Sequence, residues 1–226
     1  MSTFFKFPTT PHLFVLPGAE IRNDKILDNR DKRRFLDNIL TAEEKIDGTN
    51  LGISFDDNWN LKIQNRGSYI SPKDHPQFEP LSGWIYQRMT AFKDIIGTRY
   101  ILFGEWCVAK HSIHYTSLPD WFLGFDLYDR NKNFFVDTST RNHIMADLNV
   151  SHVPLIGKKN FTEKELSMII EAYPSNYSSE HLEGIYLRIE SGNQLIGRAK
   201  IVRPNFLQNI TLHWKGQRLV KNQIIN

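Results

Sequence analysis

The sequence predicts an α+β fold in which antiparallel sheets are flanked by helices. Stretches in which apolar and polar residues alternate, as in strands, are interspersed with stretches that repeat apolar residues every three or four positions, as in helices. The chain has 226 residues, 40% of them hydrophobic, so it can bury the core of one large domain or two small ones. We expect one domain over residues 1–226, with strands at 51–55, 60–64, 100–106, 121–128, 153–156, 183–189 and 195–202 and helices at 31–40, 81–96, 139–148, 162–173 and 205–214.

Local signals support the individual helices. Pro8 and Pro11 argue against a regular helix at the start of the chain. The polar helix at 31–40 places its apolar residues on one face, namely Phe35, Leu36, Ile39 and Leu40. The helix at 81–96 is the clearest, because apolar residues recur along its whole length. We assign this helix to the core, without a role in chemistry.

Two further signals concern the second half of the chain. Thr162 and Glu165 have the spacing of a capping box, which predicts a helix beginning there. Pro154 lies in the short predicted strand 153–156 and cannot donate a ladder hydrogen bond. That strand is therefore expected at the edge of a sheet.

The charge is unevenly distributed. The net charge is +3 and the isoelectric point is near 8.9, which is only mildly basic. Residues 191–226 contain no Asp or Glu but carry six basic residues: Arg198, Lys200, Arg203, Lys215, Arg218 and Lys221. This one-signed region is either a surface that faces phosphates or a solvated basic tail.

Cysteine content and hydropathy restrict the compartment. Cys107 is the only cysteine, so the chain has no internal disulfide and suits a reducing compartment. No signal peptide opens the sequence and no apolar run approaches transmembrane length. We expect a cytoplasmic protein without a membrane association. Cys107, His111 and His114 do not form a structural zinc site, because no second pair of ligands completes the set.

The stretch 44–50, with the sequence Glu-Lys-Ile-Asp-Gly-Thr-Asn, is the centre of the functional prediction. Lys45 stands two residues before an Asp-Gly turn, between two strand-like runs. A lysine attacks as a nucleophile only when its amine is neutral, and neighbouring cations lower its pKa. Asp-Gly between alternating apolar residues is also an ordinary hairpin signal, and a lysine beside it is usually solvated.

Other polar residues occur at strand ends or within apolar strands. Arg66 lies 21 positions beyond Lys45 and directly precedes a glycine. Glu105 interrupts an apolar run that suits a buried strand. Phe125 lies in the next strand, and Glu183 precedes a glycine at the head of another. Each has an ordinary alternative: a loop arginine, a glutamate that reaches solvent at a strand end, a core phenylalanine and a solvated turn.

The order of these motifs resembles that of the covalent nucleotidyltransferases, which include RNA ligases, DNA ligases and mRNA capping enzymes. The wording around Lys45 looks most like the ATP-dependent RNA ligases of bacteriophages and bacteria, which implies a bacterial or phage-infected cell. The motifs run from Lys45 to Lys200. Arg198 and Lys200 match a Lys-x-Lys motif, except that arginine replaces the first lysine, so a titrating role at that position is in doubt.

The resemblance implies specific roles. Lys45 becomes linked to AMP and is implied to be catalytic together with Lys200 and Arg198. Glu44 and Asn50 belong to the same motif and are implied to bind the cofactor, with Asn50 also orienting a polynucleotide phosphate. Cofactor contacts are implied for Arg66 at a phosphate, Glu105 at the ribose, Phe125 against the adenine, and Arg198 and Lys200 at the phosphates. Asp47 and Glu183 hold Mg²⁺, or Mn²⁺ in its place, through water. The cations around the phosphates are expected to lower the pKa of Lys45.

The implied protein is an ATP-dependent RNA ligase with an ATP-grasp-like core that joins 5′-phosphate and 3′-hydroxyl RNA ends. Only 26 residues follow Lys200, too few for an appended OB-fold or helical module, so RNA binding is expected to be weak and a partner protein to supply the missing surface. The open alternatives are a DNA ligase, a GTP-dependent capping-type enzyme, an adenylylating subunit that needs a partner for sealing, and a binding module that has lost catalysis.

Overall fold

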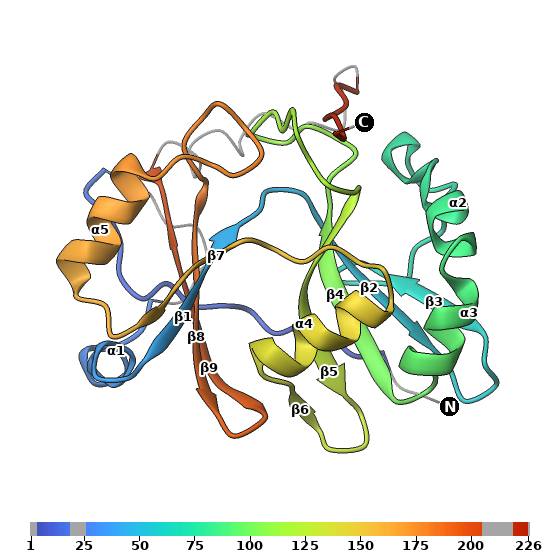
Figure 1. Cartoon of the computed structure of the whole chain (residues 1–226), viewed down its shortest axis with the longest axis horizontal. Helices are drawn as coiled ribbons and strands as arrows, with labels where there is room; N and C mark the ends of the chain where they lie inside the picture. The colour runs from blue at the N-terminus through green and yellow to red at the C-terminus, as the bar shows by residue number, and fades with distance from the viewer. Residues whose placement is uncertain (1–3, 19–25, 205–218, 226) are drawn as a thin grey trace.

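The computed structural model describes residues 4–18, 26–204 and 219–225. Figure 1 shows two sheets side by side, with helices on both outer flanks and one helix, α4 (Thr138–Asp147), in front between them. The four-stranded sheet consists of β1 (Leu40–Lys45), β7 (Leu155–Lys159), β8 (Gly184–Ser191) and β9 (Gln194–Val202). The five-stranded sheet consists of β2 (Thr49–Phe55), β3 (Leu61–Gln64), β4 (Tyr100–Trp106), β5 (Phe122–Asp129) and β6 (Phe134–Phe135). The predicted α+β class is confirmed.

All pairings between the named strands are antiparallel. The four-stranded sheet has the order β7-β1-β8-β9, and the five-stranded sheet has the order β3-β2-β4-β5-β6. β7 is an edge strand, as the proline at 154 predicts. The two sheets draw on segments far apart in sequence, since β1 from the start of the chain pairs with β7 and β8 from its second half.

The Asp-Gly turn does not close a hairpin. β1 ends at Lys45 in the four-stranded sheet and β2 begins at Thr49 in the five-stranded sheet, so residues 46–48 carry the chain from one sheet to the other. The hairpin interpretation of this stretch is therefore wrong. Because the chain belongs to a sheet on each side of this turn, Lys45 is held at the place where the two sheets meet.

The helices differ from prediction at two places. α1 (Asn29–Leu36) ends before the predicted 40, because Asp37 caps it and the chain extends into β1 at the fully buried Leu40. The apolar residue at 40 thus belongs to a strand, and Ile39 is exposed.

The long helix predicted at 81–96 is three pieces, α2 (Leu81–Tyr86), α3 (Met89–Ala91) and a π-helical turn over Phe92–Ile96. Arg88 lies between the first two pieces. Its guanidinium donates to the carbonyl of Trp84 and so satisfies an acceptor that would otherwise need a helical N–H. The apolar periodicity survives because the π turn still buries Phe92 and Ile96.

The remaining helices agree with prediction within a few residues. α4 spans Thr138–Asp147 and α5 spans Glu163–Ala172, and the capping box of Thr162 and Glu165 is confirmed. Residues 4–11 contain no regular helix, as the prolines predict. The predicted helix at 205–214 lies outside the described residues. Within the part of the chain that the structure describes, no helix is long and apolar enough to cross a membrane.

Two main apolar cores cover the outer faces of the sheets. One packs α1 and α5 against the four-stranded sheet through residues such as Phe35, Leu40 and Leu166. The other packs α2 and the π-helical turn against the five-stranded sheet through residues such as Trp84, Phe92 and Leu102. On β1, Glu43 and Lys45 alternate with the buried Leu40 and Ala42 of the first core, so they lie on the opposite face of the four-stranded sheet.

Candidate active site

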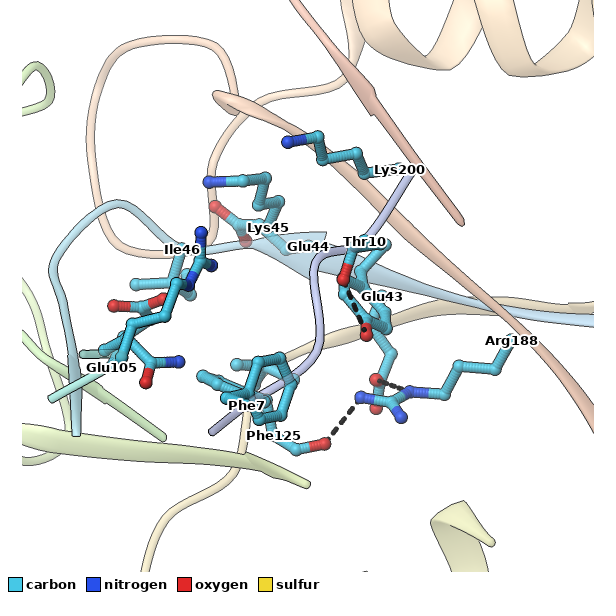
Figure 2. Close-up of a pocket in the computed structure, with 14 residues that line it drawn as sticks. Phe7, Thr10, Glu43, Glu44, Lys45, Ile46, Glu105, Phe125, Arg188 and Lys200 are labelled. Carbon is cyan, nitrogen blue, oxygen red and sulfur yellow. Dashed lines mark hydrogen bonds and ion pairs between the residues drawn. The ribbon is translucent and has the colours of Figure 1, made fainter. Parts of the chain in front are cut away.

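A pocket lies where the two sheets meet, and its lining residues come from both of them. Figure 2 shows Lys45, Lys200 and Glu44 above the rings of Phe7 and Phe125. The lining residues come from β1, β2, β4, β5, β8 and β9, from the N-terminal segment and from connections between strands: Phe7, Thr10, Glu43, Glu44, Lys45, Ile46, Asn50, Arg66, Glu105, Phe125, Val153, Tyr186, Arg188 and Lys200.

Lys45 is the last residue of β1 and points into this pocket. Its amine donates to both carboxylate oxygens of Glu183, at 2.7 and 2.5 Å. Register explains the contact, because Lys45 pairs directly with Gly184 at the start of β8. The lysine side chain is 25% exposed and that of the glutamate 10%, so the ion pair is largely shielded from water.

The surroundings of Lys45 are acidic. Burial lowers the pKa of Lys45, but the charges of Glu183, Asp47 and Glu105 outweigh burial and raise its pKa above the usual value. The expectation that cations lower this pKa is wrong for the side chains as they stand. The amine is held protonated, and a reaction that uses it as a nucleophile must first separate it from its carboxylate partner.

Loops on either side fix the neighbours of Lys45. The carboxylate of Glu44 accepts hydrogen bonds from the hydroxyl of Ser175 and from the backbone and side-chain amides of Asn176. The carboxylate of Asp47 accepts from the backbone N–H of Ser112 at 2.6 Å. The N–H of Asp47 donates to the hydroxyl of Tyr115, which is fully buried. These contacts tether the residues on both sides of Lys45 to neighbouring loops.

Two buried polar atoms of the pocket have no hydrogen-bond partner among the residues that the structure describes: Oδ1 of Asn50 and Oε2 of Glu105. The two residues pair in register on β2 and β4. Burial raises the pKa of Glu105 to about 8. Glu105 lies within β4 and is only partly exposed, and its Oε2 is fully covered, so it is not a freely solvated glutamate. Unpartnered buried polar atoms are costly, so these two fit a polar ligand that would satisfy them.

Phe125 lines the pocket from β5 at an irregularity in the strand. Phe103 pairs with Asp126 and Gly104 pairs with Gly124, which leaves Phe125 as an extra residue, as in a β-bulge. Phe7 packs against it edge to face, with ring centroids 5.4 Å apart. Such a bulge re-aims a side chain, here toward the pocket (Figure 2).

The predicted cations separate into two groups. Arg66 and Lys200 line the pocket with Lys45. Arg66 lies in a turn closed by the side chain of Asn65, which accepts from two backbone N–H groups. Arg198 is not among the lining residues. Although it shares a face with Lys200, its guanidinium contacts Asp126 at 3.2 Å and stacks over the ring of Phe135 at 4.0 Å.

The carboxylates fit a metal that retains most of its waters. Asp47 and Glu183 both act electrostatically on Lys45, and both already accept hydrogen bonds within the protein. Among the residues that the structure describes, no group of three or more His, Cys, Asp or Glu side chains could hold a metal ion. Mg²⁺ is commonly bound by one or two carboxylates together with substrate phosphates, and this donor set suits that mode.

Several pocket residues were not predicted from the sequence: Phe7, Thr10, Glu43, Ile46, Val153, Tyr186 and Arg188. A signal existed for Tyr186 and Arg188, because period two places both on the same face of β8. Likewise, Glu43 shares a face of β1 with Lys45. No local pattern identifies Phe7 or Thr10, which reach the pocket only because the N-terminal segment pairs with β9 at Lys200.

Comparison with known proteins adds to this geometry. Residues 38–202, more than half of the chain, match the RNA ligase family. No curated protein matches the chain. A solved Naegleria gruberi RNA ligase variant with ATP and Mn is similar, with a TM-score of 0.64 and 16% identity over 91% of this chain and 64% of that one.

Two other solved structures are similar. One is an archaeal ATP-dependent RNA ligase, with a TM-score of 0.58 and 16% identity over 87% of this chain and 48% of that one. The other is a candidate ATP-dependent DNA ligase from Aquifex aeolicus, with a TM-score of 0.60 and 20% identity over 90% and 51%. At such identities the likeness shows the fold, and this chain spans about half to two thirds of the length of these proteins. The family match is more specific: the chain belongs to the RNA ligase family.

Proposed function

We propose that this protein is an ATP-dependent RNA ligase that works through AMP bound covalently to Lys45. The observation that carries the proposal is the position of Lys45 in a chain of the RNA ligase family: it lies in the pocket between the sheets, with Arg66 and Lys200 lining the same pocket. The Naegleria gruberi RNA ligase variant was solved with ATP and Mn, which supports the choice of nucleotide.

The pocket offers a matching group for each part of ATP. The ring of Phe125 gives the base an apolar face, and aromatic rings stack well on bases. The unpartnered oxygens of Glu105 and Asn50 are acceptors suited to the ribose hydroxyls. Alternatively, the side-chain amide N–H of Asn50 could donate to the RNA phosphate in the later steps. Arg66 and Lys200 supply positive charge for the phosphates. Arg198 is proposed to act indirectly, through its ion pair with Asp126.

In the first step the amine of Lys45 attacks the α-phosphorus. A P–N bond forms, the bond between the α-phosphorus and the bridging oxygen breaks, and pyrophosphate leaves. The amine must first lose a proton, for which Glu183, already hydrogen-bonded to it, is the nearest acceptor. Positioning and charge stabilisation dominate such transfers, and the contacts that tether the residues on both sides of Lys45 serve the positioning.

Asp47 and Glu183 would hold a divalent metal, Mg²⁺ or Mn²⁺, through its waters. Such an ion supplies charge neutralisation for the phosphate oxygens. The ligase sequence is then completed by two exchanges. The 5′-phosphate of an RNA takes the AMP from Lys45, and a 3′-hydroxyl displaces the AMP to form the phosphodiester bond.

A sealing assay tests the substrate class. Labelled 5′-phosphate RNA and DNA strands of the same sequence are offered as nicks in duplexes, as tRNA breaks and as single strands. The proposal predicts joined RNA ends and little joining of all-DNA nicks. Preferred sealing of DNA would replace RNA ligation with DNA ligation, to which the similar Aquifex aeolicus protein points. Sealing that appears only after addition of a host extract would support the dependence on a partner protein.

A further inference from the structure

A network of buried charges ties the two sheets together directly behind the pocket. It comprises Glu43 on β1, Arg188 on β8, Asp126 on β5 and Arg141 on α4, each with a side chain no more than 1% exposed. Arg188 binds Glu43 at 2.6 Å and Asp126 at 2.5 Å. Arg141 binds the same Glu43 through both of its terminal nitrogens. Buried charges are costly unless fully paired, and these are.

Both arginines also donate to one backbone atom, the carbonyl oxygen of Phe125. Nη1 of Arg141 and Nη2 of Arg188 each lie 2.5 Å from it. Phe125 is the extra residue of the bulge, so its carbonyl is not committed to the regular ladder between β4 and β5. Two guanidinium groups, one from α4 and one from the opposite sheet, take the place of the missing partner (Figure 2 shows the contact from Arg188).

Arg188 has little capacity left for a ligand. Its Nε serves Glu43, Nη1 serves Asp126 and Nη2 serves Phe125, and its side chain is 1% exposed. It lines the pocket, but its donor groups point into the protein. A bound nucleotide would therefore sense Arg188 through the backbone and ring of Phe125.

We propose that Arg188 and Arg141, aligned by Glu43, are positioning residues that hold the bulged Phe125 in place as the platform for the nucleotide base. The proposal deepens the proposed function and rests on it. The network sets the affinity for the base, whereas the phosphates are bound by Arg66 and Lys200 on other elements. Loss of the network should weaken the binding of a whole nucleotide and leave the binding of a bare polyphosphate unchanged.

The test is equilibrium binding by isothermal titration calorimetry to Arg188→Lys, on protein stripped of nucleotide. Lysine keeps the positive charge beside Glu43 and Asp126 but lacks the fork that reaches the carbonyl of Phe125 as well. The probes are α,β-methylene-ATP, which cannot transfer AMP, and inorganic tripolyphosphate. Arg99→Lys is the matched control, because Arg99 pairs with Asp129 on the same strand β5 and does not line the pocket.

We expect Arg188→Lys to bind the ATP analogue about tenfold more weakly, a change within the range of base–aromatic stacking. Its affinity for tripolyphosphate should stay within about twofold of wild type, as should both affinities of Arg99→Lys. A double-mutant cycle with Phe125→Leu adds a second readout: in that background Arg188→Lys should cause no further loss, because it acts only through the lost ring.

Unchanged affinity for the ATP analogue in Arg188→Lys would overturn the proposal. Equal losses for both probes, or additive losses in the cycle, would also overturn it, since they indicate general damage or direct contact. If Arg188→Lys does not fold, Arg141→Lys serves in the same measurements, because it removes the other donor to the carbonyl of Phe125. Wild-type protein that binds tripolyphosphate but no ATP analogue would contradict the proposed function itself, whereas the failures above leave that function standing.

Discussion

The amine of Lys45 lies 2.5 Å from Oε2 of Glu183, so the proposed nucleophile is held in an ion pair. We expect this pairing to keep the amine protonated, and so unreactive, until a ligand redistributes the charge around it. Glu183 is proposed both to hold a divalent metal and to restrain Lys45. A metal or phosphate that draws Glu183 away would release the amine when the substrate arrives.

Replacing Glu183 should change the titration of Lys45. The charge of Glu183 raises the pKa of Lys45 against the opposing effect of burial, so Glu183→Gln should lower that pKa. Lys45 should then react with a small amine-directed reagent at lower pH than in wild type, which peptide mass spectrometry can follow. Glu180→Gln is the control, since this glutamate is exposed on the same loop. An unchanged profile in Glu183→Gln would show that the ion pair does not control the amine.

Gly48 is expected to tolerate no side chain. A Cβ there would lie 2.8 Å from the carbonyl oxygen of Trp106 and 3.2 Å from Sγ of Cys107, so the turn after Lys45 would have to move. Gly48→Ala should cost about 1–3 kcal/mol of unfolding free energy and reduce AMP transfer. Gly83→Ala, where a Cβ meets nothing within 4 Å, should instead stabilise α2 by about 0.5–1 kcal/mol. Urea unfolding of both variants measures the contrast, and similar effects at the two sites would contradict it.

The buried network predicts acid sensitivity. Burial alone would raise the pKa of Glu43, but Arg188 and Arg141 lower it to about 2. Between this value and the unfolded pKa of about 4.5 the unfolded chain binds more protons, so stability is present above pH 4.5 and is lost as pH falls toward 2.

The measurement is urea unfolding of wild type and Glu43→Gln at pH 7 and pH 3. At pH 7 the variant should be less stable by about 3–5 kcal/mol, because two buried arginines lose a charged partner. At pH 3 the gap should narrow by about 2 kcal/mol, since wild type has by then lost most of the benefit of the lowered pKa. A gap independent of pH would mean that Glu43 is not ionised in the folded protein.

Asn222 anchors the loop that holds Asp47. Its side chain is 3% exposed, accepts from the N–H of Tyr115 and donates to the carbonyls of Cys107 and Ala109. Asn222→Ala leaves these buried groups unpaired and should cost about 1–3 kcal/mol. Thermal unfolding measures the loss. Lys221→Ala, at the exposed neighbouring position, should have a small effect, and equal effects would contradict the anchoring role.

The sequence predicted most strands because period two survives wherever a sheet has one apolar and one charged face, as in β8 and β9. It placed Leu40 in a helix because one apolar residue at the end of a helical pattern cannot be distinguished from the first buried residue of a strand. It also could not show that residues 46–48 connect two sheets. That requires β1 to pair with β7 and β8, which lie more than a hundred residues further along the chain.

For the pocket, the motif residues Lys45, Asn50, Glu105, Phe125 and Lys200 were identified because their order along the chain is itself informative. The buried network was not identified, since Glu43, Arg141 and Arg188 acquire meaning only when α4 and both sheets are brought together. The predicted direction of the pKa shift of Lys45 was wrong for a related reason. The three carboxylates that raise this pKa, Asp47, Glu105 and Glu183, were all identified in the motifs, but the sequence does not show how close they lie to the amine compared with the cations.

The central claim is tested most directly by asking whether Lys45 carries AMP. Protein stripped of nucleotide is incubated with ATP and Mg²⁺ or Mn²⁺, with GTP in parallel, and then examined by peptide mass spectrometry. The account predicts AMP on the Lys45 peptide with ATP, little modification with GTP, and none in Lys45→Ala. Absence of any adduct in folded wild-type protein that binds ATP, or AMP on another residue, would contradict it.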